Sequence, residues 1–177
     1  MLWAFAIVAG LVVGLVTGGK IAHLAMLRFR WPWLILAAVA IRAAVLLTPL
    51  NRIDGAQYLY VLALAAIVVW TIIHIKRLPG VWLVTAGSAL NLLVIVVNGG
   101  RMPVAPELAA SLARHGTMGQ YTVMGGQTNL NLLGDWIVLY PVPEVYSVGD
   151  IVIALGLAIV VFLAVRNLNP YSELTPP

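Results

Sequence analysis

Apolar residues in this chain are gathered into long runs that contain few charged residues. A transmembrane helix needs roughly 20 such residues to cross about 30 Å of hydrocarbon. Runs of this length or slightly less recur along the whole sequence. The pattern predicts five membrane-spanning helices, at about residues 2–18, 33–49, 58–75, 81–98 and 150–165.

Composition strengthens this interpretation and excludes several other classes of protein. Of the 177 residues, 62% are hydrophobic and only 9% are charged, and the mean hydropathy is +1.01. A soluble domain is about one quarter charged. The absence of cysteine excludes disulfides, thiolate nucleophiles and iron–sulfur clusters. We therefore expect an all-α, five-span transmembrane bundle that forms one integral membrane domain over residues 1–177.

The distribution of basic residues predicts the orientation of the bundle, because cytoplasmic loops carry an excess of lysine and arginine. One side of the predicted bundle carries Lys20, Arg28, Arg30, Lys76, Arg77 and Arg166, and the other only Arg52, Arg101 and Arg114. This places the protein in a bacterial inner (plasma) membrane, with its N-terminus outside and its C-terminus in the cytoplasm. The bilayer is its expected partner. Nucleic acid is not, because no basic soluble region with interleaved aromatic residues exists.

Glycines in the first apolar run indicate close helix packing. Gly10, Gly14 and Gly18 recur at every fourth position, which gives a flat stripe that another helix backbone can approach. We expect this stripe to be a packing face within the protein, with a dimer contact as the alternative.

The segment 99–148 differs from the rest of the chain because it is rich in Gly, Pro, Asn, Gln and Tyr. Connections of this length are usually functional or disordered. Its Leu, Val, Met, Tyr and Trp residues argue against disorder. Within it, residues 106–116 are expected to form a short helix, with Pro near the start and Gly at the end. We predict that the segment forms an ordered extracytoplasmic polar cap.

Two acids are the most specific candidates for chemistry. Asp135 and Asp150 should both lie near the outer membrane surface. If their carboxyl groups met, they would share a proton, and one would act as base and the other as acid, as in aspartyl peptidases. The alternative for Asp150 is structural, because Ser147 and Asp150 have the spacing of a capping box at the start of the last helix.

Arg42 lies inside the second apolar run, where a charge usually faces the protein interior or a partner. It is expected to pair with Asp150, Asp135 or an anionic ligand, unless its side chain extends to the lipid headgroups instead. A polar stripe on the fourth span is formed by Ser88, Asn91 and Asn98. Its residues belong either to a ligand-binding site or to hydrogen bonds between helices. The three histidines are scattered, so no metal site or other cofactor is expected.

Three outer motifs carry a family resemblance: residues 98–104, 131–136 and 146–150. With them, the chain resembles a bacterial family of small multi-pass membrane proteins classed as a domain of unknown function. It is also similar, more weakly, to lipoprotein signal peptidase, a membrane aspartyl protease. That resemblance implies that Asn98, Asp135 and Asp150 occupy catalytic positions, although Trp136 stands where that family has arginine.

Two hypotheses follow for function. In the first, the outer polar cap binds a protein partner or a lipid-like ligand, and an accessory subunit of a membrane complex is one form of this hypothesis. In the second, the protein is a membrane-embedded aspartyl hydrolase similar to lipoprotein signal peptidase that uses Asp135 and Asp150. The sequence leaves open whether the protein is an enzyme. The expected ligand-binding residues are Asn98, Arg42, Arg101, Asn131 and Ser147.

Overall fold

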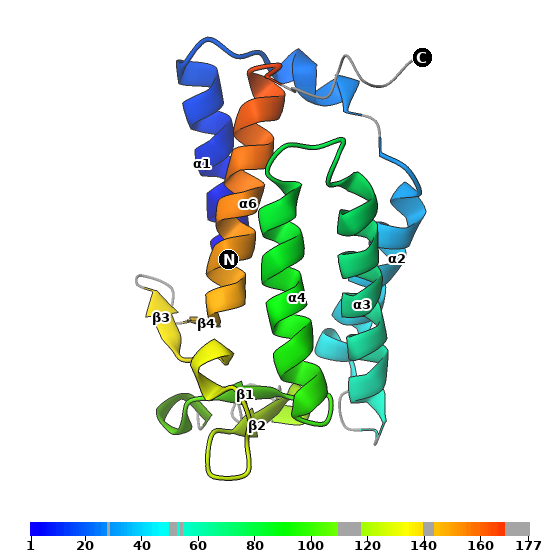
Figure 1. Cartoon of the computed structure of the whole chain (residues 1–177), viewed down its shortest axis with the longest axis vertical. Helices are drawn as coiled ribbons and strands as arrows, with labels where there is room; N and C mark the ends of the chain where they lie inside the picture. The colour runs from blue at the N-terminus through cyan, green and yellow to red at the C-terminus, as the bar shows by residue number, and fades with distance from the viewer. Residues whose placement is uncertain (28, 50–52, 54, 110–117, 140–143, 169–177) are drawn as a thin grey trace.

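The computed structural model describes residues 1–27, 29–49, 53, 55–109, 118–139 and 144–168. Long helices run side by side along one axis of the molecule, and short strands gather at one end of them (Figure 1). Successive helices run in alternating directions. The helices are α1 (Leu2–Val16), α2 (Pro32–Leu47), α3 (Ala56–His74), α4 (Val81–Val97) and α6 (Val148–Val165).

Each long helix coincides with a predicted apolar run to within two residues at either end. The first run ends early because Gly18 has φ of +92°, a left-handed conformation that terminates a helix. The second begins at Pro32, whose fixed φ suits the first helical position. The end of α1 and the start of α2 are therefore set by turn residues, which the pattern of apolar residues does not reveal.

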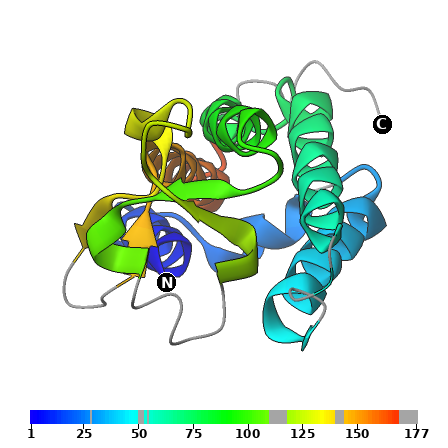
Figure 2. The same cartoon turned by 90° about the horizontal axis from the view of Figure 1, so that it is seen from below.

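The helices pack in an order that differs from their order in the chain. α1 packs against α6, α6 against α4, α4 against α3, and α3 against α2. The last helix therefore lies between α1 and α4 (Figures 1 and 2). This arrangement places the start of α6 next to side chains from the middle of the sequence.

Glycines allow the backbones at these contacts to approach closely. A Cβ at Gly14 would meet the side chain of Val165 at 3.0 Å, and one at Gly10 would meet the backbone of Ala158. The predicted packing face within the protein is confirmed for Gly10 and Gly14, and α6 is the partner. Gly18 instead serves as a turn residue.

Two of the helices, α3 and α6, are long and apolar enough to cross a membrane. Only 33% and 28% of their apolar windows are buried inside the protein, although the core helix of a soluble protein is mostly buried. The shorter apolar helices are Leu2–Val16, Pro32–Val45 and Val81–Val97. Length and composition thus support an association of this chain with membranes.

The segment 99–148 contains strands, so the prediction of a purely helical protein is corrected to a mostly helical one. β1 (Met102–Val104) pairs in parallel with β2 (Tyr121–Val123), and β3 (Ile137–Leu139) pairs antiparallel with β4 (Glu144–Tyr146). Strands of three residues are too short for alternation to reveal them. The 3-10 turns are η3 (Met118–Gln120) and η4 (Asn131–Leu133). Of the predicted helix 106–116, residues 106–109 are helical and the rest lies outside the described residues.

At the opposite end of the bundle, the connection from α1 to α2 contains the 3-10 helix η1 (Ile21–Met26). Side chains of α3 hold the end of this connection. His74 Nε2 accepts a hydrogen bond of 3.0 Å from the backbone N–H of Arg30, and Trp70 Nε1 donates one of 2.9 Å to its carbonyl oxygen. The two rings stack at 4.0 Å between centroids. This clip orders the entry into α2.

Candidate functional site

A closed set of hydrogen bonds joins α4 to the first turn of α6. Asn91 Nδ2 donates to Asp150 Oδ1 at 3.0 Å, and Ser147 Oγ donates to Asn91 Oδ1 at 2.9 Å. The backbone N–H groups of Ser147 and Asp150 donate to Asp150 Oδ2 and to Ser147 Oγ, which completes a capping box. Ser147 therefore caps α6, as the structural alternative predicts, and both oxygens of the Asp150 carboxylate have partners.

Asp135 is held in place by the backbone of β1. Its N–H donates to the Pro103 carbonyl oxygen at 2.8 Å, and its own carbonyl oxygen accepts from Ala105 N–H at 3.0 Å. Since β2 pairs with the other edge of β1, that strand is bonded on both sides. Gly134 makes the approach possible, because a Cβ there would lie 2.6 Å from the Pro103 oxygen. Hydrogen bonds to Pro103 and Ala105 therefore hold the backbone of Asp135 in place.

The Asp135 carboxyl group is buried, with 5% of the residue exposed, and its Oδ1 has no hydrogen-bond partner among the described residues. Burial raises the pKa of Asp135 well above 3.8, and the nearby negative charge of Asp150 adds to the effect. No hydrogen bond joins the two carboxyl groups, both of which are described. The two carboxyl groups are electrostatic neighbours whose hydrogen bonds do not join them to each other.

Arg42 pairs with an aromatic residue. Its Nη2 donates to the hydroxyl oxygen of Tyr60 at 2.6 Å, and its guanidinium lies 4.7 Å from the Tyr60 ring centroid and 5.9 Å from that of Trp3. Neither aspartate forms an ion pair with it, so the expected pairing with Asp135 or Asp150 is not what the structure contains. Arg42 therefore joins α1, α2 and α3.

Two tyrosines connect Arg42 to the acids. Tyr60, from α3, lies within electrostatic range of Arg42, Asp135 and Asp150. Tyr121, from β2, is partly buried like Tyr60. Desolvation raises the pKa of Tyr121, and the negative charges of Asp135 and Asp150 raise it further. We call Arg42, Tyr60, Tyr121, Asp135 and Asp150 the polar cluster. It lies where the 99–148 segment meets the helix ends.

The remaining predicted site residues lie around this cluster or away from it. Asn98, at the end of α4, is bound to the backbone of Asn129. Its side chain accepts a hydrogen bond from the Asn129 N–H and donates one to the Asn129 carbonyl oxygen. Asn131 begins η4, and its buried Oδ1 has no hydrogen-bond partner among the described residues. Arg101 is exposed. No group of residues in the described part of the chain has the composition of a metal site.

Sequence reasoning missed three members of this region: Trp3, Tyr60 and Tyr121. Trp3 carries a buried Nε1 donor that has no hydrogen-bond partner within the described residues. Tyr60 is not among the residues expected at the site, although a partly buried arginine needs a neighbouring hydrogen-bond acceptor. That need for an acceptor was the available signal, but it does not single out one tyrosine.

Comparisons with known proteins give a family and no activity. The model of a family of unknown function, DUF5317, matches residues 26–162. This range includes α2, α3, α4 and every member of the polar cluster. No curated protein and no solved structure matches the chain.

Proposed function

The chain belongs to DUF5317, a family of unknown function, and from its geometry we propose that it is a five-span membrane protein that binds a lipid-like ligand at the polar cluster. The proposal has two parts. The first is the embedding of the helices in a bilayer. The second is the use of a partly buried polar site at their outer ends.

Surface composition supports the embedding. Large apolar side chains are exposed on all five long helices, among them Phe5, Leu36, Leu62, Leu93 and Leu155. A water-soluble protein rarely leaves such extended apolar surface uncovered. At 1.5 Å per residue, α1 is about 22 Å long and α4 about 25 Å. Helices of this length suit a locally thinned bilayer or flanking polar anchors.

Charge supports an orientation with the 99–148 segment outside. Lys20, Lys76 and Arg166 lie at the end of the bundle opposite this segment, whereas Asp135 and Asp150 lie beside it. The excess of cations marks the cytoplasmic side of an inner membrane. The segment then forms an extracytoplasmic cap over the ends of α4 and α6.

The single observation that carries the ligand proposal is the orphaned carboxyl oxygen of Asp135. A buried polar atom without a partner costs about 1–3 kcal/mol, so such groups are retained where they have a use. Trp3 Nε1 is an orphaned donor next to Arg42. The neighbourhood thus offers an acceptor, a donor and a cation to a molecule that carries complementary groups.

These groups specify the chemistry of the ligand. A phosphate oxygen would accept hydrogen bonds from Arg42 and Trp3, and a headgroup ammonium or hydroxyl would donate to Asp135. The row of helices ends with α1 on one side and α2 on the other, and the Arg42 guanidinium of α2 lies 5.9 Å from the ring centroid of Trp3 in α1. A lipid headgroup would enter between α1 and α2. The burial of Asp135 favours such a small ligand group over a protein partner.

Lipid binding by native mass spectrometry tests this proposal. The purified, delipidated protein is titrated with phosphatidylethanolamine, whose ammonium donates hydrogen bonds, and with phosphatidylcholine of the same acyl chains, whose ammonium does not. We expect phosphatidylethanolamine to bind about tenfold more tightly, the ratio for one strong hydrogen bond of about 1.4 kcal/mol. Asp135→Leu should abolish this preference, and Glu107→Gln, an exposed acid in the same segment, should keep it. Equal binding of the two lipids by the wild-type protein would refute the proposal.

One observation favours the second candidate, an aspartyl hydrolase: the charge of Asp150 acts on Asp135. Against it, Asp150 is bound by Asn91 and by the backbone of its own capping box. A catalytic pair would have to release these bonds to share a proton with Asp135. The hydrolase predicts that Asp135→Asn and Asp150→Asn both abolish cleavage of a membrane-bound lipopeptide, a reaction that the binding protein lacks from the start.

A further inference from the structure

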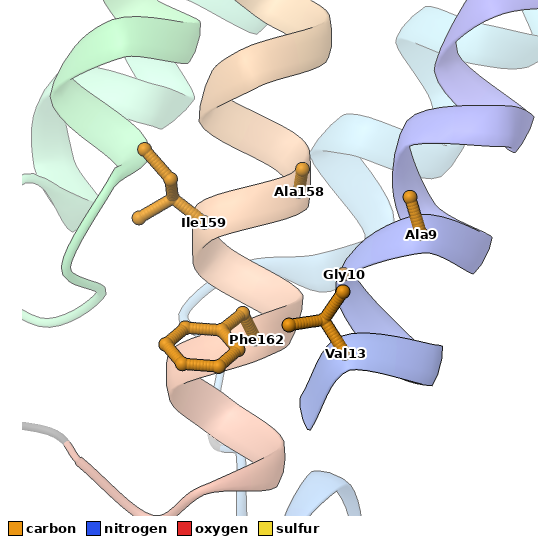
Figure 3. Close-up of a pocket in the computed structure, with 6 residues that line it drawn as sticks. All are labelled: Ala9, Gly10, Val13, Ala158, Ile159 and Phe162. Carbon is orange, nitrogen blue, oxygen red and sulfur yellow. The ribbon is translucent and has the colours of Figure 1, made fainter. Parts of the chain in front are cut away.

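An apolar groove runs between α1 and α6, far from the polar cluster. Its volume is about 210 Å³, and it is lined by Ala9, Gly10, Val13, Ala158, Ile159 and Phe162 (Figure 3). Every residue that lines the groove is apolar, so it suits part of an acyl chain.

A cation lies on the line of the groove. Ala158, Phe162 and Arg166 are spaced four residues apart, so they share one face of α6. The Arg166 guanidinium reaches the end of α1, because its Nη1 lies 3.4 Å from the position of a Cβ at Gly18. Its buried Nε has no hydrogen-bond partner among the described residues. The arginine therefore places its guanidinium at the end of the apolar groove.

The surroundings of Arg166 include a second cation, Lys20. The Lys20 N–H donates to the Val165 carbonyl oxygen, and His23 Nδ1 lies 2.7 Å from the same oxygen. The carboxylates in the described part of the chain all belong to the other end of the bundle: Glu107, Asp135, Glu144 and Asp150. An anionic group at Arg166 would therefore be attracted by both Arg166 and Lys20.

We infer that this groove holds one acyl chain of an anionic phospholipid, with the lipid phosphate on Arg166. Planar guanidinium donors fit phosphate oxygens in pairs, and anionic headgroups are concentrated on the cytoplasmic side of membranes, where basic sites between helices bind them. The inference rests on the proposed membrane embedding and is independent of any ligand at Asp135. It assigns the protein a second lipid site, on the opposite face of the bilayer.

Competition between two lipids in native mass spectrometry tests the inference. Purified, delipidated protein is titrated with phosphatidylglycerol, which is anionic, and phosphatidylcholine, which is zwitterionic, with the same acyl chains. We expect the wild-type protein to prefer phosphatidylglycerol about tenfold. Arg166→Gln should remove this preference, while Lys76→Gln, an exposed cation at the same end of the bundle, should retain it. Ala9→Phe, which fills the groove from an exposed position, should weaken both lipids, whereas Ala4→Phe on the same helix should not.

Each contrary outcome has a distinct meaning. Equal losses in Arg166→Gln and Lys76→Gln would overturn the inference, because they would indicate a diffuse charge effect. A change from dimer to monomer in Ala9→Phe would overturn it by showing that a second copy of the chain covers the groove. If Arg42→Gln, and not Arg166→Gln, removed the preference for phosphatidylglycerol, the anionic lipid would belong to the polar cluster, and only the further inference would fail.

Discussion

Asn91 donates a hydrogen bond of 3.0 Å to the Asp150 carboxylate, and this bond fixes α4 to the first turn of α6. The same asparagine accepts from Ser147 through its Oδ1. The Asn91 side chain therefore binds both residues of the capping box, Ser147 and Asp150. The attachment of the first turn of α6 to α4 therefore depends on this asparagine.

Replacing Asn91 by alanine should destabilise the protein by about 1–3 kcal/mol, because Ser147 and Asp150 would each lose a buried partner. Thermal unfolding in detergent measures the change. Thr85→Val is the control, since the Thr85 hydroxyl bonds only to Val81 in its own helix, and it should shift stability by about 0.5 kcal/mol or less. Comparable effects of the two substitutions would contradict the central role of Asn91.

Asp135 should make stability fall as pH rises. Its folded-state pKa is raised above 3.8 by burial, so below this pH the acid is protonated in both states and costs nothing. Above it, the unfolded chain ionises and the folded chain does not, and each pH unit removes about 1.4 kcal/mol until the folded pKa is passed. Chemical denaturation between pH 4 and 8 should show this slope, and Asp135→Leu should flatten it and raise stability at pH 8. A slope that persists in the variant would assign the effect to another group.

Gly87→Ala should separate α4 from α6. A Cβ at Gly87 would lie 2.5 Å from the Gly149 carbonyl oxygen, and backbone cannot yield as a side chain does. We expect a loss of about 1–3 kcal/mol in unfolding free energy. Gly125→Ala serves as the control, because a Cβ at Gly125 would meet open space. If both variants unfolded at the same temperature, the contact would be looser than this geometry requires.

Trp70→Phe should loosen the entry into α2. The substitution keeps an aromatic ring beside His74 but removes the hydrogen bond from Nε1 to the Arg30 carbonyl oxygen, which is worth about 0.5–1.5 kcal/mol. Hydrogen exchange at the Arg30 amide should accelerate by about tenfold. Trp82→Phe changes an exposed tryptophan of α4 and should leave that amide unaffected. Equal exchange in both variants would show that His74 alone holds the connection.

The proposed orientation predicts which positions a membrane-impermeant thiol reagent reaches in intact cells. The chain has no cysteine, so each single replacement reports one position. Gly126→Cys should react from outside, because its Cβ faces open space. Lys76→Cys, exposed at the end of α3, should react only after the cells are opened. The reverse pattern would invert the topology and place the polar cluster in the cytoplasm.

The helices could be predicted from the sequence because each consists of a continuous apolar run, and such runs can be read directly. The position of α6 could not. Gly87 and Gly149 bring α4 and α6 into contact, but a glycine in an apolar run does not indicate which partner it faces. The packing order therefore required the structure.

The candidate site divides in the same way. The capping box of Ser147 and Asp150 follows from local spacing, and the structure contains it. The neighbourhood of Arg42, Tyr60 and Asp135 comes from α2, from α3 and from the backbone next to β1. Three separate elements must meet before it exists, and no local pattern encodes that meeting.

The pairing of α1 with α6 has a consequence for biosynthesis. During synthesis, α1 finds its main neighbour only when α6 has been made, because residues 17–147 lie between them. Until then, the face of α1 that carries Gly10 and Gly14 lacks α6, the helix against which it packs. Quality-control proteases should consequently recognise truncated or stalled chains by this exposed face of α1.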